Sequence, residues 1–244
     1  MNTFKTISKI LTIITFSLLI FSCSDDDSVT NMPEPMPTAM PFVTKVVATG
    51  SSAPLNKTFS MIYNSKKQLS QLSVFGTENN AYAFSYNDQG KITEIAVNGS
   101  TPGKITLTYD SNGRLSSYKK VDGTNVPVTY NASSEVYTAG VEFFSFNGFE
   151  DFTAINGSPL SYDNSKNGAF ANANGNYQFL AILIDPLLVY LGSKKPVNDF
   201  MATTNLDYVF TNTFSEDQMI KNMKISIVED PATGFNADFT YENK

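Results

Sequence analysis

The sequence predicts an all-β domain, an antiparallel meander of consecutive hairpins that forms a curved sheet or a partly closed barrel. Three observations support this fold class. Short alternations of apolar and polar residues recur about every ten residues from Phe42 onward, and a strand–turn–strand unit repeats at a spacing of 23 residues. The connections are also too short for the crossover helices that parallel strands need. One apolar segment, at about 177–191, departs from this pattern and predicts a short helical insert.

The first 22 residues predict an export signal. Lys5 and Lys9 give a positive start, and the apolar run over 10–21 has the length of a signal-peptide core, since a membrane-spanning helix needs about 20 apolar residues. The run ends in Leu-Ile-Phe-Ser followed by Cys23, the single cysteine of the chain. This ending resembles a bacterial lipobox, which implies cleavage before Cys23 and a lipid anchor on it. The alternative is an unmodified thiol in an exported protein.

An acidic run and a proline-rich segment follow this cysteine. The acidic run resembles the surface-export signal of Bacteroidota-type lipoproteins, and the alternative is a solvated linker with no specific role. Prolines at 33, 35, 37 and 41 favour an extended tether and preclude a helix. The residues of the predicted export signal are Ser24, Asp25, Asp26 and Asp27. The predicted domains are a signal peptide (1–22), an acidic and proline-rich tether (23–42) and a single β-domain (43–244).

The three copies of the repeat begin at Tyr63, Tyr86 and Tyr109, and each predicts a strand, a tight turn and a second strand. The Asn or Asp after each tyrosine can form an Asx turn. A glycine at the fifth position of the second and third copies can adopt the left-handed conformation that closes a hairpin. The first copy has Lys67 at that position, so we expect its turn to be looser or differently shaped.

The strands that leave these turns carry apolar residues three apart, as in Leu69 and Leu72, instead of strict alternation. We interpret this spacing as a β-bulge beside each turn that switches the faces of the strand. The pattern resembles the YD, or RHS-type, hairpin repeat over roughly 61–131. With the lipobox and the tether, it makes the chain similar to small surface lipoproteins of unknown function with a porin-like, curved β-meander. The other expected strands are 42–48, 57–63, 125–130, 136–146, 207–214, 219–228 and 235–241.

The apolar insert predicts two short helical pieces that break near Asp185. Asp185 followed by Pro186 is typical of a helix start, and Gly192 of a helix end. Because the segment is apolar on nearly all sides, we expect it to be buried and to plug one end of the curved sheet. Two alternatives are the wall of a hydrophobic pocket and a docking surface for an outer-membrane partner.

The composition excludes several kinds of chemistry. The absence of histidine removes the commonest general base and metal ligand, and one cysteine allows neither an intrachain disulfide nor a thiolate zinc site. A formal charge of -6 with a single arginine argues against nucleic-acid binding. We therefore expect no catalytic residue, no metal and no cofactor.

The remaining candidate site is an aromatic and acidic segment over 141–152, which contains Glu142, Glu150 and Asp151. Aromatic rings beside carboxylates occur in glycan sites, although acidic residues also lie on the solvent side of strands. The phenylalanines of this candidate ligand platform are Phe143, Phe144, Phe146, Phe149 and Phe152.

We expect a non-catalytic binding or scaffold module, held on the outer membrane by a lipid on Cys23 and exposed at the cell surface. The expected partners are the membrane, an outer-membrane protein or a glycan, and not a nucleic acid. One alternative is a glycan-binding or glycan-active lipoprotein that uses the segment 141–152, and another is a lipid-carrying shell around 177–191.

Overall fold

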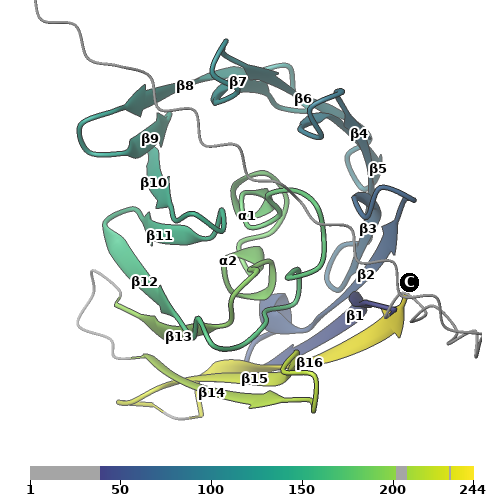
Figure 1. Cartoon of the computed structure of the whole chain (residues 1–244), viewed down its shortest axis with the longest axis vertical. Coiled ribbons are helices and arrows are strands. Elements are labelled where there is room, and N and C mark those ends of the chain that lie inside the picture. The colour runs from purple at the N-terminus through teal and green to yellow at the C-terminus, as the bar shows by residue number, and fades with distance from the viewer. Residues whose placement is uncertain (1–38, 202–207, 231) are drawn as a thin grey trace, which may run out of the picture. The chain divides into compact units, whose positions relative to one another are not determined.

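A computed structural model of the chain describes residues 39–201, 208–230 and 232–244. The signal peptide, Cys23, the export signal and most of the tether lie outside these residues. The described residues form one 16-stranded sheet in which β1 to β13 follow in chain order, and β16, β15 and β14 continue from the other side of β1. The edge strands β13 and β14 lie side by side and nearly close the sheet into a barrel (Figure 1). The predicted all-β meander is therefore confirmed.

The elements are short and are joined mostly by tight turns. The strands are β1 (Pro41–Gly50), β2 (Lys57–Tyr63), β3 (Leu69–Phe75), β4 (Asn80–Tyr86), β5 (Ile92–Gly99), β6 (Gly103–Tyr109), β7 (Leu115–Lys119), β8 (Asn125–Asn131), β9 (Val136–Ala139), β10 (Glu142–Phe146), β11 (Phe152–Ile155), β12 (Ser158–Tyr162), β13 (Val197–Phe200), β14 (Tyr208–Phe214), β15 (Ile220–Ile227) and β16 (Gly234–Asn243). The helical elements are η1 (Ala53–Leu55), α1 (Leu180–Leu183) and α2 (Leu188–Leu191).

Two parts of the strand prediction were wrong. The segment 136–146 is two strands, because Gly140 has a positive φ of 66° and a two-residue turn pairs Ala139 with Glu142. The strands β11, β12 and β13 were not predicted because they are only four or five residues long. Asn156 and Gly157 join β11 to β12 with φ values of 50° and 79°, which is the Asn-Gly hairpin signal.

The three repeats form the hairpins β2–β3, β4–β5 and β6–β7, and the predicted bulges are present. The pairing register shifts beside each turn. At each bulge a hydroxyl group donates to a carbonyl oxygen of the facing strand, at 3.0, 3.3 and 3.1 Å. The donors are Ser70, Thr93 and Ser116.

The expectation of a different first turn was wrong. Lys67 has φ 62°, close to 76° and 73° at the two glycines, and its amide donates to Asn64 at 3.0 Å as the glycine amides do in their turns. The backbone amide of Asn174 donates to the carbonyl of Lys67 at 2.8 Å, and its side chain donates to the carbonyl of Lys66 at 2.7 Å. These contacts hold the lysine turn in the shape that glycine adopts unaided.

The insert, defined here as residues 163–196, crosses the inside of the ring of strands (Figure 1). Its helical pieces break at Asp185, whose side chain accepts a hydrogen bond from the Leu187 amide at 3.0 Å and pairs with Lys57. Leu180, Leu188 and Leu191 are buried in one core with the inward side chains of the strands. The predicted buried, broken helical insert is confirmed. None of the helices in the described ranges is both long and apolar enough to span a bilayer.

Candidate ligand-binding cavity

A cavity of about 870 Å³ lies between the insert and the inner face of the sheet, at the end where the repeat turns lie. This volume is in the range of small-molecule sites. Side chains from the repeat turns, from β8 to β10 and their following turn, and from the insert line it. Three stretches that are distant in the sequence therefore meet at one site.

The buried residues of the cavity, which form its inner end, are mostly apolar, and the exposed residues of its mouth are mostly polar. The buried side chains that line the cavity are Gln68, Ile92, Leu107, Phe144 and Phe179. The exposed residues of the mouth are Lys66, Asp88, Gln89, Glu135, Gly148, Glu150 and Asn174. One end of a ligand in this site would contact mostly apolar side chains. Its other end would lie beside the charged and amide groups of the mouth.

One wall is a continuous aromatic cluster. Tyr137 stacks on Phe144 with ring centroids 5.5 Å apart and an interplanar angle of 6°. Tyr130 lies 4.7 Å from Tyr137, and Phe179 of the insert lies 5.8 Å from Phe144. Such packed rings form a rigid surface whose faces and edges can meet a flat ligand.

The hydroxyl groups of the second and third repeat tyrosines form hydrogen bonds within the fold. The Tyr86 hydroxyl donates to the carbonyl of Leu69 at 2.6 Å, and the Tyr109 hydroxyl donates to the carbonyl of Ile92 at 2.7 Å. Burial raises the pKa of both phenols, so they remain protonated donors. Each tyrosine thus ties its hairpin to the preceding one, and only the ring of Tyr109 lines the cavity.

Three cations of the repeat turns line the cavity, namely the exposed Lys66 and the half-buried Lys91 and Arg114. Lys91 Nζ lies 5.7 Å from the centroid of the Tyr109 ring, and the guanidinium of Arg114 lies 4.3 Å from that of Tyr130. Both residues directly follow the turn glycine of their repeat, and both are half-buried. The repeat therefore places its basic position toward the interior of the barrel.

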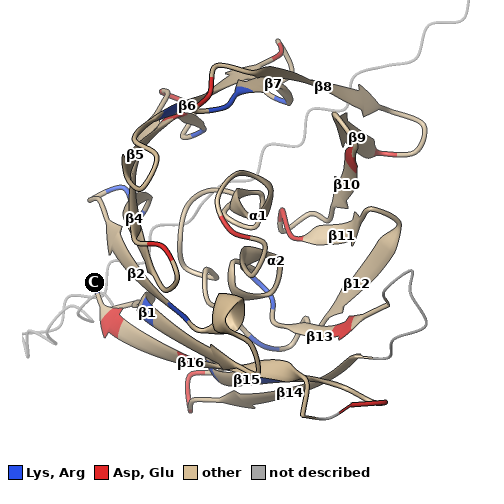
Figure 2. Ribbon diagram, turned by 180° about the vertical axis from the view of Figure 1, so that it is seen from behind, with Lys and Arg blue, Asp and Glu red and all other residues tan. Residues whose placement is uncertain are grey.

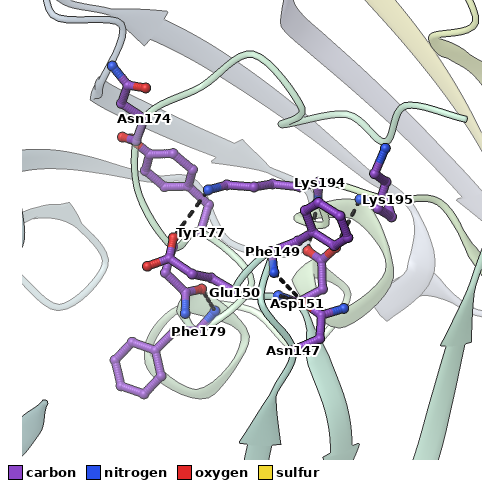
Figure 3. Close-up of polar contacts among 10 residues, drawn as sticks. Asn147, Phe149, Glu150, Asp151, Asn174, Tyr177, Phe179, Lys194 and Lys195 are labelled. Carbon is purple, nitrogen blue, oxygen red and sulfur yellow. Dashed lines mark hydrogen bonds and ion pairs between the residues drawn. The ribbon is translucent and has the colours of Figure 1, made fainter. Parts of the chain in front are cut away.

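The turn after β10 connects the cavity mouth to the insert (Figure 3). The buried carboxylate of Asp151 accepts the backbone amides of Lys194 at 2.7 Å and Lys195 at 2.9 Å. Burial raises the pKa of Asp151 to about 6, against the opposing effect of those hydrogen bonds. Its neighbour Glu150 lines the mouth and forms an ion pair with the Lys194 side chain at 3.1 Å. Asp151 is thus a structural group, and Glu150 faces the site.

The structure does not bring the five phenylalanines of the predicted platform onto one surface. Phe144 and Phe146 line the cavity, and Phe152 is buried behind them, stacked 4.8 Å from Phe146. Phe143 is 43% exposed, and Phe149 is 48% exposed with Lys195 over its ring. The cavity residues of the repeats were not predicted, although the basic residue after each turn glycine was a visible signal.

Within the described part of the chain, no group of three or more Cys, Asp or Glu residues is placed to hold a metal ion.

No family model matches the chain, and no curated protein matches its sequence. Among solved structures, it is similar to a porin-like protein from Bacteroides uniformis, with a TM-score of 0.50 and 11% identity over 82% of this chain and 98% of that chain. The fold is porin-like. A porin-like protein from Bacteroides vulgatus gives a TM-score of 0.39 at 12% identity, over 83% and 99% of the two chains. A Photorhabdus luminescens Tc holotoxin pore gives 0.26 at 8% identity, over 77% of this chain and 8% of that chain.

The porin-like domain has polar residues on its outer face. In β8 the outward positions are Asn125, Pro127, Thr129 and Asn131, and the inward Val128 is buried. Figure 2 shows charged residues on the turns of the ring and on some of its strands, such as β13 and β16. Barrels that cross membranes have the opposite pattern, an apolar outer band around a polar interior. The outer face is therefore suited to contact with water.

Proposed function

We propose that this protein is an outer-membrane lipoprotein, exposed at the cell surface, that binds a ligand in the barrel cavity without catalysing a reaction. The cavity is the observation on which the proposal depends. It has a rigid aromatic wall, a mostly apolar inner end and a mostly polar mouth, which are the features of preformed small-molecule sites.

The polar outer face supports attachment through a lipid rather than insertion of the barrel. Ser, Thr and Asn side chains on strands would be costly to place in hydrocarbon, whereas acyl chains on Cys23 would hold a water-exposed domain at the membrane. Replacement of Cys23 by Ala should release the protein from the membrane fraction, and Ser24→Ala serves as the neighbouring control. Retention of the Cys23→Ala variant on membranes would contradict the anchor.

The acidic run can be tested separately. Replacement of Asp25, Asp26 and Asp27 by Asn removes three charges with little change in size. We expect the lipidated variant to stay in the outer membrane and lose its accessibility to protease on intact cells. Unchanged accessibility would remove the export signal from the proposal while leaving the anchor in place.

A non-catalytic role is supported by the groups at the cavity mouth. The chain has no histidine, and the Glu150 carboxylate is held in an ion pair with Lys194. The buried Asp151 accepts one backbone amide on each carboxylate oxygen, so the fold uses both of its oxygens. Product formation during a polysaccharide screen would overturn the non-catalytic role.

A glycan-binding role is the second candidate, because Phe144, Phe146 and Glu150 of the segment 141–152 line the cavity. Retention on an immobilised polysaccharide should then fall at least tenfold in Phe146→Ala, which removes a cavity ring. Phe143→Ala is the matched control, since its ring lies on the outer face of the same strand. Equal retention of both variants would place the glycan elsewhere or exclude this candidate.

A further inference from the structure

Lys91 and Arg114 are half-buried cations that line the cavity without a carboxylate partner among the described residues, and we infer that they select an amphipathic organic anion. The ligand class is a molecule with a flat apolar body and one carboxylate, sulfate or sulfonate group. This inference rests on the ligand-binding role proposed above and specifies what the cavity binds.

The fold holds the two cations next to each other. Lys91 and Arg114 occupy the same position of successive repeats, so the pairing of β5 with β6 sets them on adjacent hairpins. The side chain of Lys91 crosses the turn of the next repeat, where a Cβ on Gly113 would lie 3.1 Å from its Cε. The absence of a side chain at Gly113 therefore gives Lys91 the path by which it reaches the cavity.

Neither cation forms an ion pair within the described residues. Among the described residues, the ion pairs are made by Lys57, Lys104 and Lys194, and none involves Lys91 or Arg114. Their aromatic contacts stabilise a cation less than a carboxylate does. A half-buried cation in this state favours an incoming anion, and the planar guanidinium of Arg114 offers paired donors to one.

The acidic groups at the site do not cancel this charge. Asp88 and Glu135 lie at the exposed rim, where water screens them, and Glu150 is already paired with Lys194. The excess charge inside the mouth is therefore positive.

The aromatic wall and the inner end define the rest of the ligand. The rings of Tyr137, Phe144 and Phe179 line the cavity, beside the buried amide of Gln68. A free inorganic anion would leave this surface against water. A flat apolar body would cover it and place its anionic group beside Lys91 and Arg114.

A pair of fluorescent probes distinguishes the contribution of the anionic group to binding from that of the apolar body. 8-Anilinonaphthalene-1-sulfonate and N-phenyl-1-naphthylamine share one aromatic skeleton, and only the first carries a sulfonate. The protein is the chain from Ser24 to Lys244, which lacks the lipidated residue and retains the whole compact unit 39–244 with its own core. We expect 1:1 binding of both probes, at least tenfold tighter for the sulfonate.

Variants test whether the preference for the sulfonate probe depends on Lys91 and Arg114. Lys91→Gln/Arg114→Gln should weaken sulfonate binding about tenfold or more and leave the neutral probe within about twofold. Lys119→Gln removes an exposed charge from the outer face and should change neither. Phe146→Ala should weaken both probes, and Phe143→Ala should weaken neither, which locates the binding in the cavity. Unchanged melting temperatures show that the variants are folded.

The outcomes separate this inference from the proposed function. Equal binding of both probes, or a sulfonate preference that survives in the double variant, would overturn the inference and leave a ligand-binding cavity. Binding of neither probe, or binding insensitive to Phe146→Ala, would overturn the cavity as a ligand site as well.

Discussion

The repeat arc, defined as the three hairpins β2 to β7, and the insert that it surrounds are stabilised in different ways. The arc repeats one small set of interactions, an Asx turn, a hydroxyl across a bulge and a tyrosine hydroxyl to the preceding hairpin. The insert is held by single contacts that occur once each. Gln178 joins the amide of Phe152, the hydroxyl of Tyr162 and the carbonyl of Val189. Stability is thus distributed in the arc and concentrated in the insert.

This difference has a consequence for the cavity. The arc provides the positions of Lys91 and Arg114 through its regular geometry, whereas the inner end depends on where the insert is held. Loss of one insert contact should therefore affect both stability and the cavity, and loss of one arc contact should affect neither strongly.

The largest expected effect comes from Gln178→Ala. This change leaves a buried amide of Phe152 and a buried carbonyl of Val189 without partners, so we expect a loss of about 3–5 kcal/mol in unfolding free energy. Gln71→Ala in the arc removes a bond to Ser73 on the outer face and should cost less than about 0.5 kcal/mol. Chemical denaturation measures both. Similar costs would show that the insert is no more dependent on single contacts than the arc.

The next effect concerns the pH dependence of Asp151, which fastens the insert to the turn after β10. Burial raises its pKa from 3.8 to about 6 in the folded protein. The folded state then binds this proton more tightly than the unfolded chain, so the group's contribution to stability is present below pH about 4 and is lost as the pH rises to about 6. The difference corresponds to about 3 kcal/mol.

Comparison with Asp151→Asn isolates this group from the other carboxylates. The unfolding free energy of the unmodified protein, relative to that of the variant, should fall between pH 4 and pH 7. A relative stability that is the same at both pH values would contradict the proposed titration. An increase with pH would show that the two backbone hydrogen bonds outweigh burial.

The same contrast explains what the sequence could predict. The arc was predicted because its Asx turns, glycines and alternating faces lie within ten residues of one another. The break at Asp185 was predicted for the same reason, since Pro186 is its neighbour. The turn at Gly140 was missed because the flanking apolar residues continue the strand pattern. The Asn156–Gly157 hairpin carries the Asn-Gly signal of a two-residue turn, but it was not predicted.

The cavity could not be predicted from local pattern. Tyr109, Tyr137 and Phe179 meet only because the sheet closes and the insert returns across it. The order of residues along the chain does not show that these three side chains lie close together in the fold. Lys91 and Arg114 form a repeated basic position in the sequence, but the repeat motif alone does not show that this position faces a cavity.

A smaller effect tests whether the tyrosine contacts of the arc are equivalent. Tyr86→Phe removes a hydroxyl that donates to Leu69 at 2.6 Å, and we expect a loss of about 1 kcal/mol. Tyr63→Phe removes the corresponding hydroxyl of the first repeat, which is buried and has no hydrogen-bond partner among the described residues. That change should be neutral or stabilising, because no bond is lost and a desolvated polar atom is removed. Equal losses in thermal unfolding would show that the first repeat makes the same contact as the others.

The smallest effect tests how the insert shapes the arc at the first turn. Lys67 has a left-handed φ of 62°, which is costly for a residue with a Cβ and free of strain for glycine. Lys67→Gly should therefore stabilise the fold by about 0.5 kcal/mol, the gain being reduced by the greater entropy of glycine in the unfolded chain. Asn174→Ala removes the side-chain contact to the carbonyl of Lys66, and we expect it to cost less in the Lys67→Gly background than in the unmodified chain. A double-mutant cycle measures this coupling. Independent, additive effects would show that the lysine turn holds its shape without the insert.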